Sequence, residues 1–510
     1  MHLHFERTCS SRTDCAVLSL TWMGKVPDEL PEEDGWRLNR VNYYQDGWLA
    51  SGNARGIVGV TFTTCHCRKT AEHPVRTNYN LRGHRSEVTL VKWNEPYQKL
   101  ASCDSSGIIF VWIKYEGRWS IELINDRNTQ VTDFAWSHDG RMALICYQDG
   151  FVLVGSVAGQ RYWSSTLNLD RAAILCGIWA PDDHQVLFGT SNGQILVSDM
   201  HGEVVAQVTL VEDAAIVAMA WSCEKFKMEE ADEEQRSEAV PPTQAPESKL
   251  SVLAVCFSNG VIHVMKNYDD ISPTIINTGL KDIKVEWSNS GEMLAVAGVT
   301  SESSEGDCRN KIHFYTDAGL LRFVAAIPYT QSPVTAMTWG HNDKRLFVAT
   351  GSVIHIGWVT RRIASLQLLS RLTLHRALRH EDAVHKLPLP RRLRALVANL
   401  FGQTVKCYLP EANQLREFVS RPHTVRLHCT MVRHDTEDLV TGSATYTLFL
   451  EYLGGLVPLL KGKRASKLRP EFVIYDPQQP QPKRLQPPGG SSDATPSDSD
   501  VDEGCASSPG

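Results

Sequence analysis

The feature that most constrains the fold is a tryptophan that returns at a fixed interval. Trp93, Trp136 and Trp179 are 43 residues apart, and each is followed 14 residues later by a glycine. Between tryptophan and glycine the chain passes from polar turn residues into a short apolar run, such as Gln185-Val186-Leu187-Phe188-Gly189. Short apolar runs bounded by turn residues are typical of buried strands. The sequence therefore predicts a series of equivalent units, each built from short strands.

Further copies of this unit are stretched by insertions at turns, where added length costs little free energy. They begin at Trp22, Trp221, Trp287 and Trp339. A period of about 40–45 residues with four strands per unit is typical of WD40 propellers. We predict a mainly β fold with a seven-bladed WD40-type β-propeller over residues 1–360, its tryptophans packed in the core between blades. The usual Trp-Asp dipeptide is absent from the expected places, and only Gly83-His84 matches the usual Gly-His pair.

A ring of sheets needs its last blade completed, because an unpaired strand would leave an open edge. The pattern of the seventh unit runs out after Ile354-His355-Ile356. We predict that His2-Leu3-His4-Phe5, at the other end of the sequence, supplies the missing outer strand.

Composition narrows the class of function. The net charge is −6, so the overall balance gives no reason to expect a nucleic-acid partner. Thirteen cysteines without a Cys-x-x-Cys pair, no apolar signal segment and no run of 18 apolar residues predict a reducing, cytoplasmic location. The spacing of Cys65-His66-Cys67 matches no standard zinc site. We expect no metal, no cofactor and no catalytic site, and Gly52-x-x-x-Gly56 lacks the Gly-Lys ending of a phosphate-binding loop.

Two segments have the composition of disordered chain. The insertion at about 224–249 is acidic, and the tail 478–510 is rich in Pro, Gly, Ser and Asp. Within the tail, Ser497 and Ser499 lie in an acidic context that resembles casein-kinase sites, but a solvated tail without a switch fits equally well.

The segment 361–410 changes from strand to helix periodicity. Leu366, Ser370, Leu374 and Leu378 recur every four residues, which places them on one face of a helix. Pro388 and Pro390 prevent that helix from continuing, and a second helix is expected across 391–400.

The order of residues in this segment resembles a SOCS box. The pattern around Ser365, Leu366, Leu369, Ser370 and Leu374 is similar to the elongin-binding BC box, although Ser370 stands where cysteine is commonest. The turn Leu387, Pro388, Leu389 and Pro390 is similar to the cullin-5 box. The resemblance implies binding to elongin B and elongin C, and to cullin-5 with its RING subunit. The alternative is a helical bundle that packs under the propeller.

The segment 411–477 returns to strands, expected near 426–431, 446–452 and 472–475. Residues 459–470 resemble the opening strands of a tubby domain, in which a similar basic loop helps to hold phosphoinositide headgroups. Here that loop would include Lys461, Lys463, Arg464 and Lys467. Because only the beginning of the domain is matched, we expect an incomplete β segment without autonomous folding or membrane phosphoinositide contact, and these side chains as a solvated turn.

Propeller, SOCS box and tubby-like start, in that order, resemble the tubby superfamily. The resemblance implies a substrate-recognition subunit of an elongin–cullin ubiquitin ligase, whose propeller binds a substrate protein that the sequence does not identify. The phrase around Trp93 also resembles propellers of intraflagellar-transport proteins. The alternative is therefore a non-enzymatic scaffold in ciliary trafficking, and a weaker one is a lipid-anchored transcription regulator.

Overall fold

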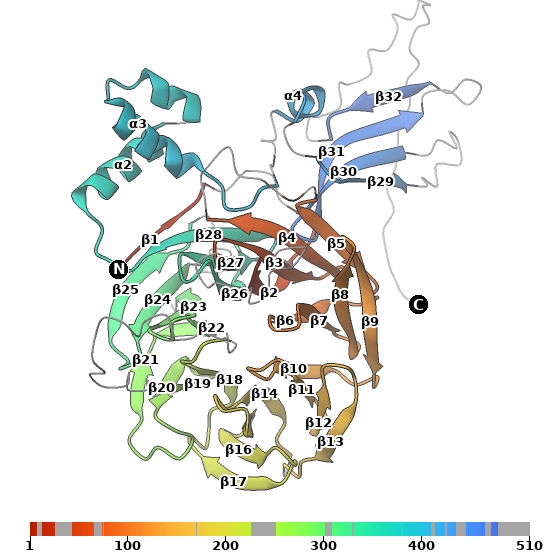
Figure 1. Cartoon of the computed structure of the whole chain (residues 1–510), viewed down its shortest axis with the longest axis vertical. Helices are drawn as coiled ribbons and strands as arrows, with labels where there is room; N and C mark the ends of the chain where they lie inside the picture. The colour runs from red at the N-terminus through yellow and green to blue at the C-terminus, as the bar shows by residue number, and fades with distance from the viewer. Residues whose placement is uncertain are drawn as a thin grey trace, which may run out of the picture.

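A computed structural model contains the predicted ring of seven four-stranded antiparallel sheets (Figure 1). It describes residues 1–477 apart from 8–12, 26–42, 66–73, 75, 170, 226–250, 301–308, 329–330, 379, 408, 410–413, 424–425, 435–444 and 465–470. The predicted tail, and all of the predicted acidic insertion except Glu224 and Lys225, lie outside the described residues.

The innermost strand of each of the first three blades contains a repeat tryptophan, and within each blade consecutive strands are neighbours. Blade 1 contains β2 (Val17–Gly24), β3 (Asp46–Asn53), β4 (Ile57–Thr64) and β5 (Asn78–Arg82). Blade 2 contains β6 (Val88–Asn94), β7 (Lys99–Asp104), β8 (Ile108–Tyr115) and β9 (Arg118–Asp126). Blade 3 contains β10 (Val131–Trp136), β11 (Met142–Tyr147), β12 (Phe151–Ser156) and β13 (Arg161–Thr166).

The next three blades repeat this order. Blade 4 contains β14 (Ile174–Trp179), β15 (Gln185–Thr190), β16 (Gln194–Asp199) and β17 (Val204–Thr209). Blade 5 contains β18 (Ile216–Trp221), β19 (Leu253–Phe257), β20 (Val261–Met265) and β21 (Thr274–Asn277). Blade 6 contains β22 (Leu280–Trp287), β23 (Met293–Thr300), β24 (Asn310–Thr316) and β25 (Leu321–Ala326).

The seventh blade is closed by the start of the chain, as predicted. It contains β26 (Val334–Gly340), β27 (Arg345–Thr350) and β28 (Val353–Thr360), and β1 (His2–Phe5) pairs antiparallel with β28. Leu3 points into the core of this blade and is 6% exposed. The blade thus joins the first and last strands of the propeller, and β28 is paired on both sides.

The repeat tryptophans pack between blades and also link them by hydrogen bonds. In four blades the indole Nε1 donates to a backbone carbonyl in the preceding blade, at the residue just before that blade's own tryptophan. The pairs are Trp136 with Lys92 (3.2 Å), Trp179 with Ala135 (3.2 Å), Trp287 with Ala220 (3.0 Å) and Trp339 with Glu286 (3.1 Å). The fixed interval in the sequence therefore places each indole against the same point of its neighbour.

After the propeller come short helices, which lie beside the closing strand (Figure 1). They are α2 (Leu366–Ala377), the 3₁₀ helix η2 (Glu381–Lys386), α3 (Arg391–Ala398) and the 3₁₀ helix η3 (Asn399–Phe401). The two predicted helices correspond to α2 and α3. Within the described residues, no helix has the length and apolar character needed to cross a membrane.

The last described part is a separate four-stranded antiparallel sheet beyond blade 1 (Figure 1). It contains β29 (Cys429–His434), β30 (Thr445–Tyr452), β31 (Gly455–Arg464) and β32 (Phe472–Tyr475), and α4 (Leu415–Ser420) packs against it. Strand β29 begins three residues later than the predicted strand 426–431, because its pairing with β30 starts at Cys429, opposite Leu450. The sheet has a small core of its own, formed by Leu415, Phe418, Leu450, Val457 and Leu459.

Candidate functional site on the helical segment

The helix α2 begins at a side-chain cap. Ser365 has an extended backbone, and its hydroxyl oxygen accepts a hydrogen bond from the N–H of Leu368 at 3.2 Å. Such a cap satisfies one of the backbone donors that the first turn of a helix leaves unpaired. The predicted site residue Ser365 therefore fixes where the helix starts, and with it the direction in which Leu366 points.

The two faces of α2 differ in exposure. Leu366 is 81% exposed and Leu369 is 42% exposed, and Ser370 is exposed beside them. On the opposite face Leu372 is 5% exposed. Leu374 is half-buried. The residues predicted to share one helix face, Leu366, Ser370, Leu374 and Leu378, are therefore exposed at the start of the helix and half-buried toward its end. An exposed apolar pair at the start of a capped helix is a surface suited to a groove in another protein.

The predicted cullin-binding residues form a turn between η2 and α3. The N–H of Leu387 donates to the Val384 carbonyl at 3.2 Å, and the N–H of Leu389 donates to the Leu387 carbonyl at 2.8 Å. Leu387 and Leu389 are half-buried, whereas Pro388 and Pro390 are exposed. Pro390 is the N-terminal cap residue of α3. The alternation presents two prolines to solvent, each next to a half-buried leucine.

Arg7 attaches the far end of α2 to the propeller. Its guanidinium donates to the carbonyl oxygens of His375 and Leu378, at the C-terminal end of the helix, where carbonyls lack partners within the helix. The same guanidinium lies 5.1 Å from the ring centre of Phe401, and the ring of His375 lies 4.5 Å from that of Phe401. A positive charge at a helix C-terminus is also favoured by the helix dipole.

Glu6 holds the segment that leaves the helices. Its carboxylate accepts hydrogen bonds from the Trp358 indole at 2.6 Å and from the Thr404 N–H at 3.1 Å. Burial raises the pKa of Glu6, while the hydrogen bonds from Thr404 and Trp358 oppose that rise. Arg345 donates to the Thr404 hydroxyl at 2.9 Å and lies 3.8 Å from the Trp358 ring centre.

Sequence reasoning missed Glu6, Arg7 and Arg345 as the residues that hold the helices. Glu6 and Arg7 come directly after the predicted closing strand, and this position is the one feature of the sequence that could have drawn attention to them. Their partners in and after the helices lie 368 to 398 residues away along the chain, and no local pattern reveals such pairs.

The turn between β30 and β31 inserts into blade 1. Ser51 Oγ donates to the Leu453 carbonyl at 2.8 Å, and Asn53 donates to the Gly454 carbonyl at 2.9 Å. Leu453 is 3% exposed and belongs to the same core as the first blade. Gly454 has φ +81° and lies against Gly59, where neither backbone leaves room for a Cβ. The C-terminal sheet is thus attached through its hairpin tip.

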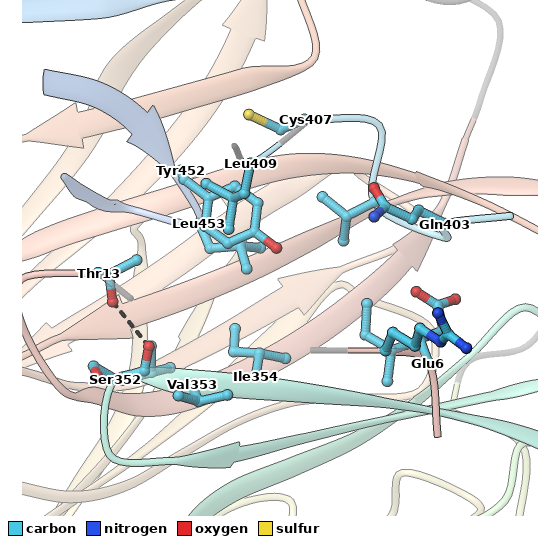
Figure 2. Close-up of a pocket in the computed structure, with 14 residues that line it drawn as sticks. Glu6, Thr13, Ser352, Val353, Ile354, Gln403, Cys407, Leu409, Tyr452 and Leu453 are labelled. Carbon is cyan, nitrogen blue, oxygen red and sulfur yellow. Dashed lines mark hydrogen bonds between the residues drawn. The ribbon is translucent and has the colours of Figure 1, made fainter. Parts of the chain in front are cut away.

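Figure 2 shows the space between the closing strand, blade 7 and this hairpin. Glu6 lies at one end of this space. Tyr452 and Leu453 of the hairpin lie on the side of the space opposite Val353 and Ile354. Thr13 donates to the Ser352 carbonyl at 3.0 Å across its other end. The cavity measures about 70 Å³, so it holds a few water molecules and no substrate of ordinary size.

The basic residues predicted for phosphoinositide contact are only partly described. Lys461 is half-buried and Lys463 is exposed, and their spacing puts both on one face of β31. The side chain of Arg464 and the whole of Lys467 lie outside the described residues. The expectation of a solvated turn without lipid contact stays a prediction, with only Lys461 and Lys463 placed, both on a strand.

The comparisons with known proteins agree with this architecture. The model of the WDR35/TULP4 N-terminal β-propeller family matches residues 33–360. Tubby-related protein 4 of Homo sapiens is 48% identical over 484 residues, which cover 91% of this chain and 31% of that protein. WD repeat-containing protein 35 of Rattus norvegicus is 32% identical over 334 residues, which cover 62% of this chain and 27% of that protein. The chain thus spans about a third of the length of the curated relatives that it matches.

Proposed function

We propose that this chain, which belongs to the WDR35/TULP4 N-terminal β-propeller family, is the substrate-recognition subunit of an elongin–cullin ubiquitin ligase. The observation that carries the proposal is the exposure of Leu366, 81%, on the first turn of a helix whose start is capped by Ser365. Leu369, one helical turn further on, is 42% exposed, and exposed apolar side chains that lie together on a surface indicate an interaction site.

Elongin C is the partner that this surface fits. Leu366 would enter an apolar groove of the adaptor, and Leu369 would extend the contact along the helix. Ser370 is small and exposed, so it allows the two backbones to approach closely at the centre of the contact. Elongin B would join through elongin C.

The turn at Pro388 and Pro390 would contact cullin-5, which carries the RING subunit. Both prolines are exposed, and proline presents its ring to a partner at low entropic cost because its φ is fixed. Ubiquitin transfer would take place on a conjugating enzyme held by the RING subunit, so the chain needs no catalytic group for this role.

The propeller would bind the protein to be modified. Glu6 and Arg7 attach the helices to the closing strand, which gives the receptor and the adaptor site a defined relative position. Such a position matters in a ligase, because the bound protein must reach the ubiquitin that the machinery carries.

Co-purification tests the proposal. The full chain, expressed with elongins B and C, should capture both, and Leu366→Asp should abolish capture. Ile363→Asp is the matched control, since Ile363 is 87% exposed in the same segment but precedes the helix. Failure of the parent chain to capture elongins would overturn the proposal, and capture that survives Leu366→Asp would show that the adaptor binds elsewhere.

The double variant Leu387→Ala with Pro388→Ala separates the two partners. It should retain elongins B and C and lose most of its binding to cullin-5. Equal loss of both partners would contradict the separate roles assigned to α2 and the proline turn.

The second candidate is a non-enzymatic WD-repeat scaffold in ciliary trafficking. It is favoured by the resemblance around Trp93 and by the match to WD repeat-containing protein 35, which extends over 334 residues, about the length of the propeller. On this alternative the helices after the propeller would not capture elongins, so the same co-purification distinguishes the two functions.

A further inference from the structure

The central channel of the propeller has a mouth with a distinct chemical lining. The ends of the innermost strands β2, β6, β10, β14, β18, β22 and β26 line this mouth, together with turns that follow several of them. A cavity of about 360 Å³ occupies this mouth, which is within the range of sites for small molecules. Its walls include the repeat tryptophans Trp22, Trp93, Trp136, Trp179, Trp221 and Trp287.

Three successive blades bring a cysteine, a histidine and a carboxylate together at this mouth. His138 lies in the turn after β10 of blade 3, Asp183 in the turn after β14 of blade 4, and Cys223 two residues after β18 of blade 5. His138 and Cys223 line the cavity. The repeat of the propeller thus aligns three residues that are 45 and 40 positions apart in the sequence.

The geometry is that of a nucleophile, a base and a residue that orients the base. The Nε2 atom of His138 lies 3.2 Å from Cys223 Sγ, and its Nδ1 atom lies 2.7 Å from Asp183 Oδ1. Asp183 also accepts the backbone N–H of His138 at 2.9 Å and that of Asp139 at 3.1 Å. The carboxylate is therefore fixed, and it keeps a proton on Nδ1 so that Nε2 faces the thiol.

The electrostatics of the site favour the protonated form of His138. Burial lowers the pKa of His138, but the hydrogen bonds with Asp183 and Cys223 outweigh burial and raise that pKa to about 9. A thiol paired with an imidazole is the arrangement that makes cysteine reactive in proteins.

We propose that Cys223 is a nucleophile that forms covalent adducts with small α,β-unsaturated carbonyl compounds at the channel mouth. The thiol proton passes to His138 Nε2, and Sγ forms a bond to the β carbon while the double-bond electrons move onto the carbonyl oxygen. The imidazolium then returns its proton to the α carbon. The addition has no leaving group and needs no oxidant.

This class of ligand suits the surroundings. The lining combines indole rings with charged side chains such as Lys92, Lys225 and Glu286, which suits a ligand that has both an apolar carbon–carbon double bond and a polar carbonyl. The double bond is a soft electrophile, which matches sulfur. A metal is not the better occupant, because within the described residues no group of three His, Cys, Asp or Glu side chains converges on one point. Asp183 contacts the side of the imidazole that faces away from Cys223.

The test is the rate of modification of the full chain by acrylamide at neutral pH, followed for each cysteine by peptide mass spectrometry. Cys223 should react about tenfold or more faster than Cys429, which is the more exposed of the two. His138→Gln should slow the modification of Cys223 by about tenfold or more and leave Cys429 unchanged.

A matched control separates chemistry from blade packing. Asp343 makes the same type of contact in blade 7, where it accepts the N–H of Asn289 at 2.6 Å and that of Ser290 at 3.2 Å. Asp183→Asn should slow the modification of Cys223, and Asp343→Asn should not. The proposal is overturned if Cys223 reacts no faster than Cys429, or if His138→Gln leaves its rate unchanged in a folded protein.

Discussion

Glu6 accepts a hydrogen bond from the backbone N–H of Thr404 at 3.1 Å, which joins the strand that closes the propeller to the segment that leaves the helices. The neighbouring Arg7 holds the end of α2. Ring closure and helix attachment therefore depend on consecutive residues of one short segment. Any change that detaches β1 is expected to release the proposed adaptor-binding helix as well.

Removal of the closing strand should destabilise the propeller. Deletion of residues 1–8 should lower the melting temperature markedly, because β28 would lose its outer partner. The single change Leu3→Ala should cost about 2–4 kcal/mol, as expected for a leucine in a packed core. Val205→Ala is the control, since Val205 is 52% exposed on an outer strand. An unchanged melting temperature after the deletion would refute closure by β1.

The indole hydrogen bonds between blades should be measurable as stability. Trp339→Phe removes the donor to the Glu286 carbonyl and should cost about 1–3 kcal/mol more than the loss of ring volume alone. Trp93→Phe removes a buried N–H that has no partner among the described residues, so its cost should be smaller. Chemical denaturation of both variants provides the measurement, and equal costs would contradict a role for the bond.

The contact between Gly59 and Gly454 should control attachment of the C-terminal sheet. A Cβ on Gly59 would lie 2.3 Å from the Gly454 nitrogen, so Gly59→Ala should push the hairpin tip away from blade 1. Limited proteolysis near 410–425 should then become faster. Gly462→Ala is the matched control, because a Cβ there meets nothing within 4 Å. Protection that is the same in both variants would show that the tip does not carry the attachment.

Acid should loosen α2 from the propeller. Burial lowers the pKa of His375 to about 4, with smaller contributions from Arg7 and Arg376. The unfolded histidine, with a pKa near 6.5, binds a proton that the folded one does not, so its stabilising effect is complete above pH 6.5 and is lost as the pH falls toward 4.

The melting temperature of the parent chain between pH 6.5 and pH 4 measures this effect. His375→Gln should show a shallower fall, and the difference between the two curves isolates His375 from the other buried histidines. Parallel curves would mean that this histidine does not titrate on unfolding.

Much of the fold was predictable because it rests on local patterns. The 43-residue interval from Trp93 to Trp136 to Trp179 predicted the blades, and the missing strand of the seventh unit predicted the pairing of β1 with β28. The spacing of leucines after residue 365 predicted α2, which ends at Ala377, eleven residues before the first of the two prolines. The strands and helices depend on burial and backbone sterics over a few residues, whereas the closure followed from the need to pair the outer edge of β28.

The sequence by itself thus determined the elements, their repeat and the order of propeller, helices and final sheet. Only the tertiary structure decided that Leu366 faces solvent while Leu374 is half-buried, and that Leu453 docks against Ser51. The tertiary structure also decided that His138 contacts both Asp183 and Cys223 at the mouth of the central channel. The physical reason is that strand and helix formation depends on neighbours along the chain, whereas exposure and side-chain pairing depend on residues brought together by packing.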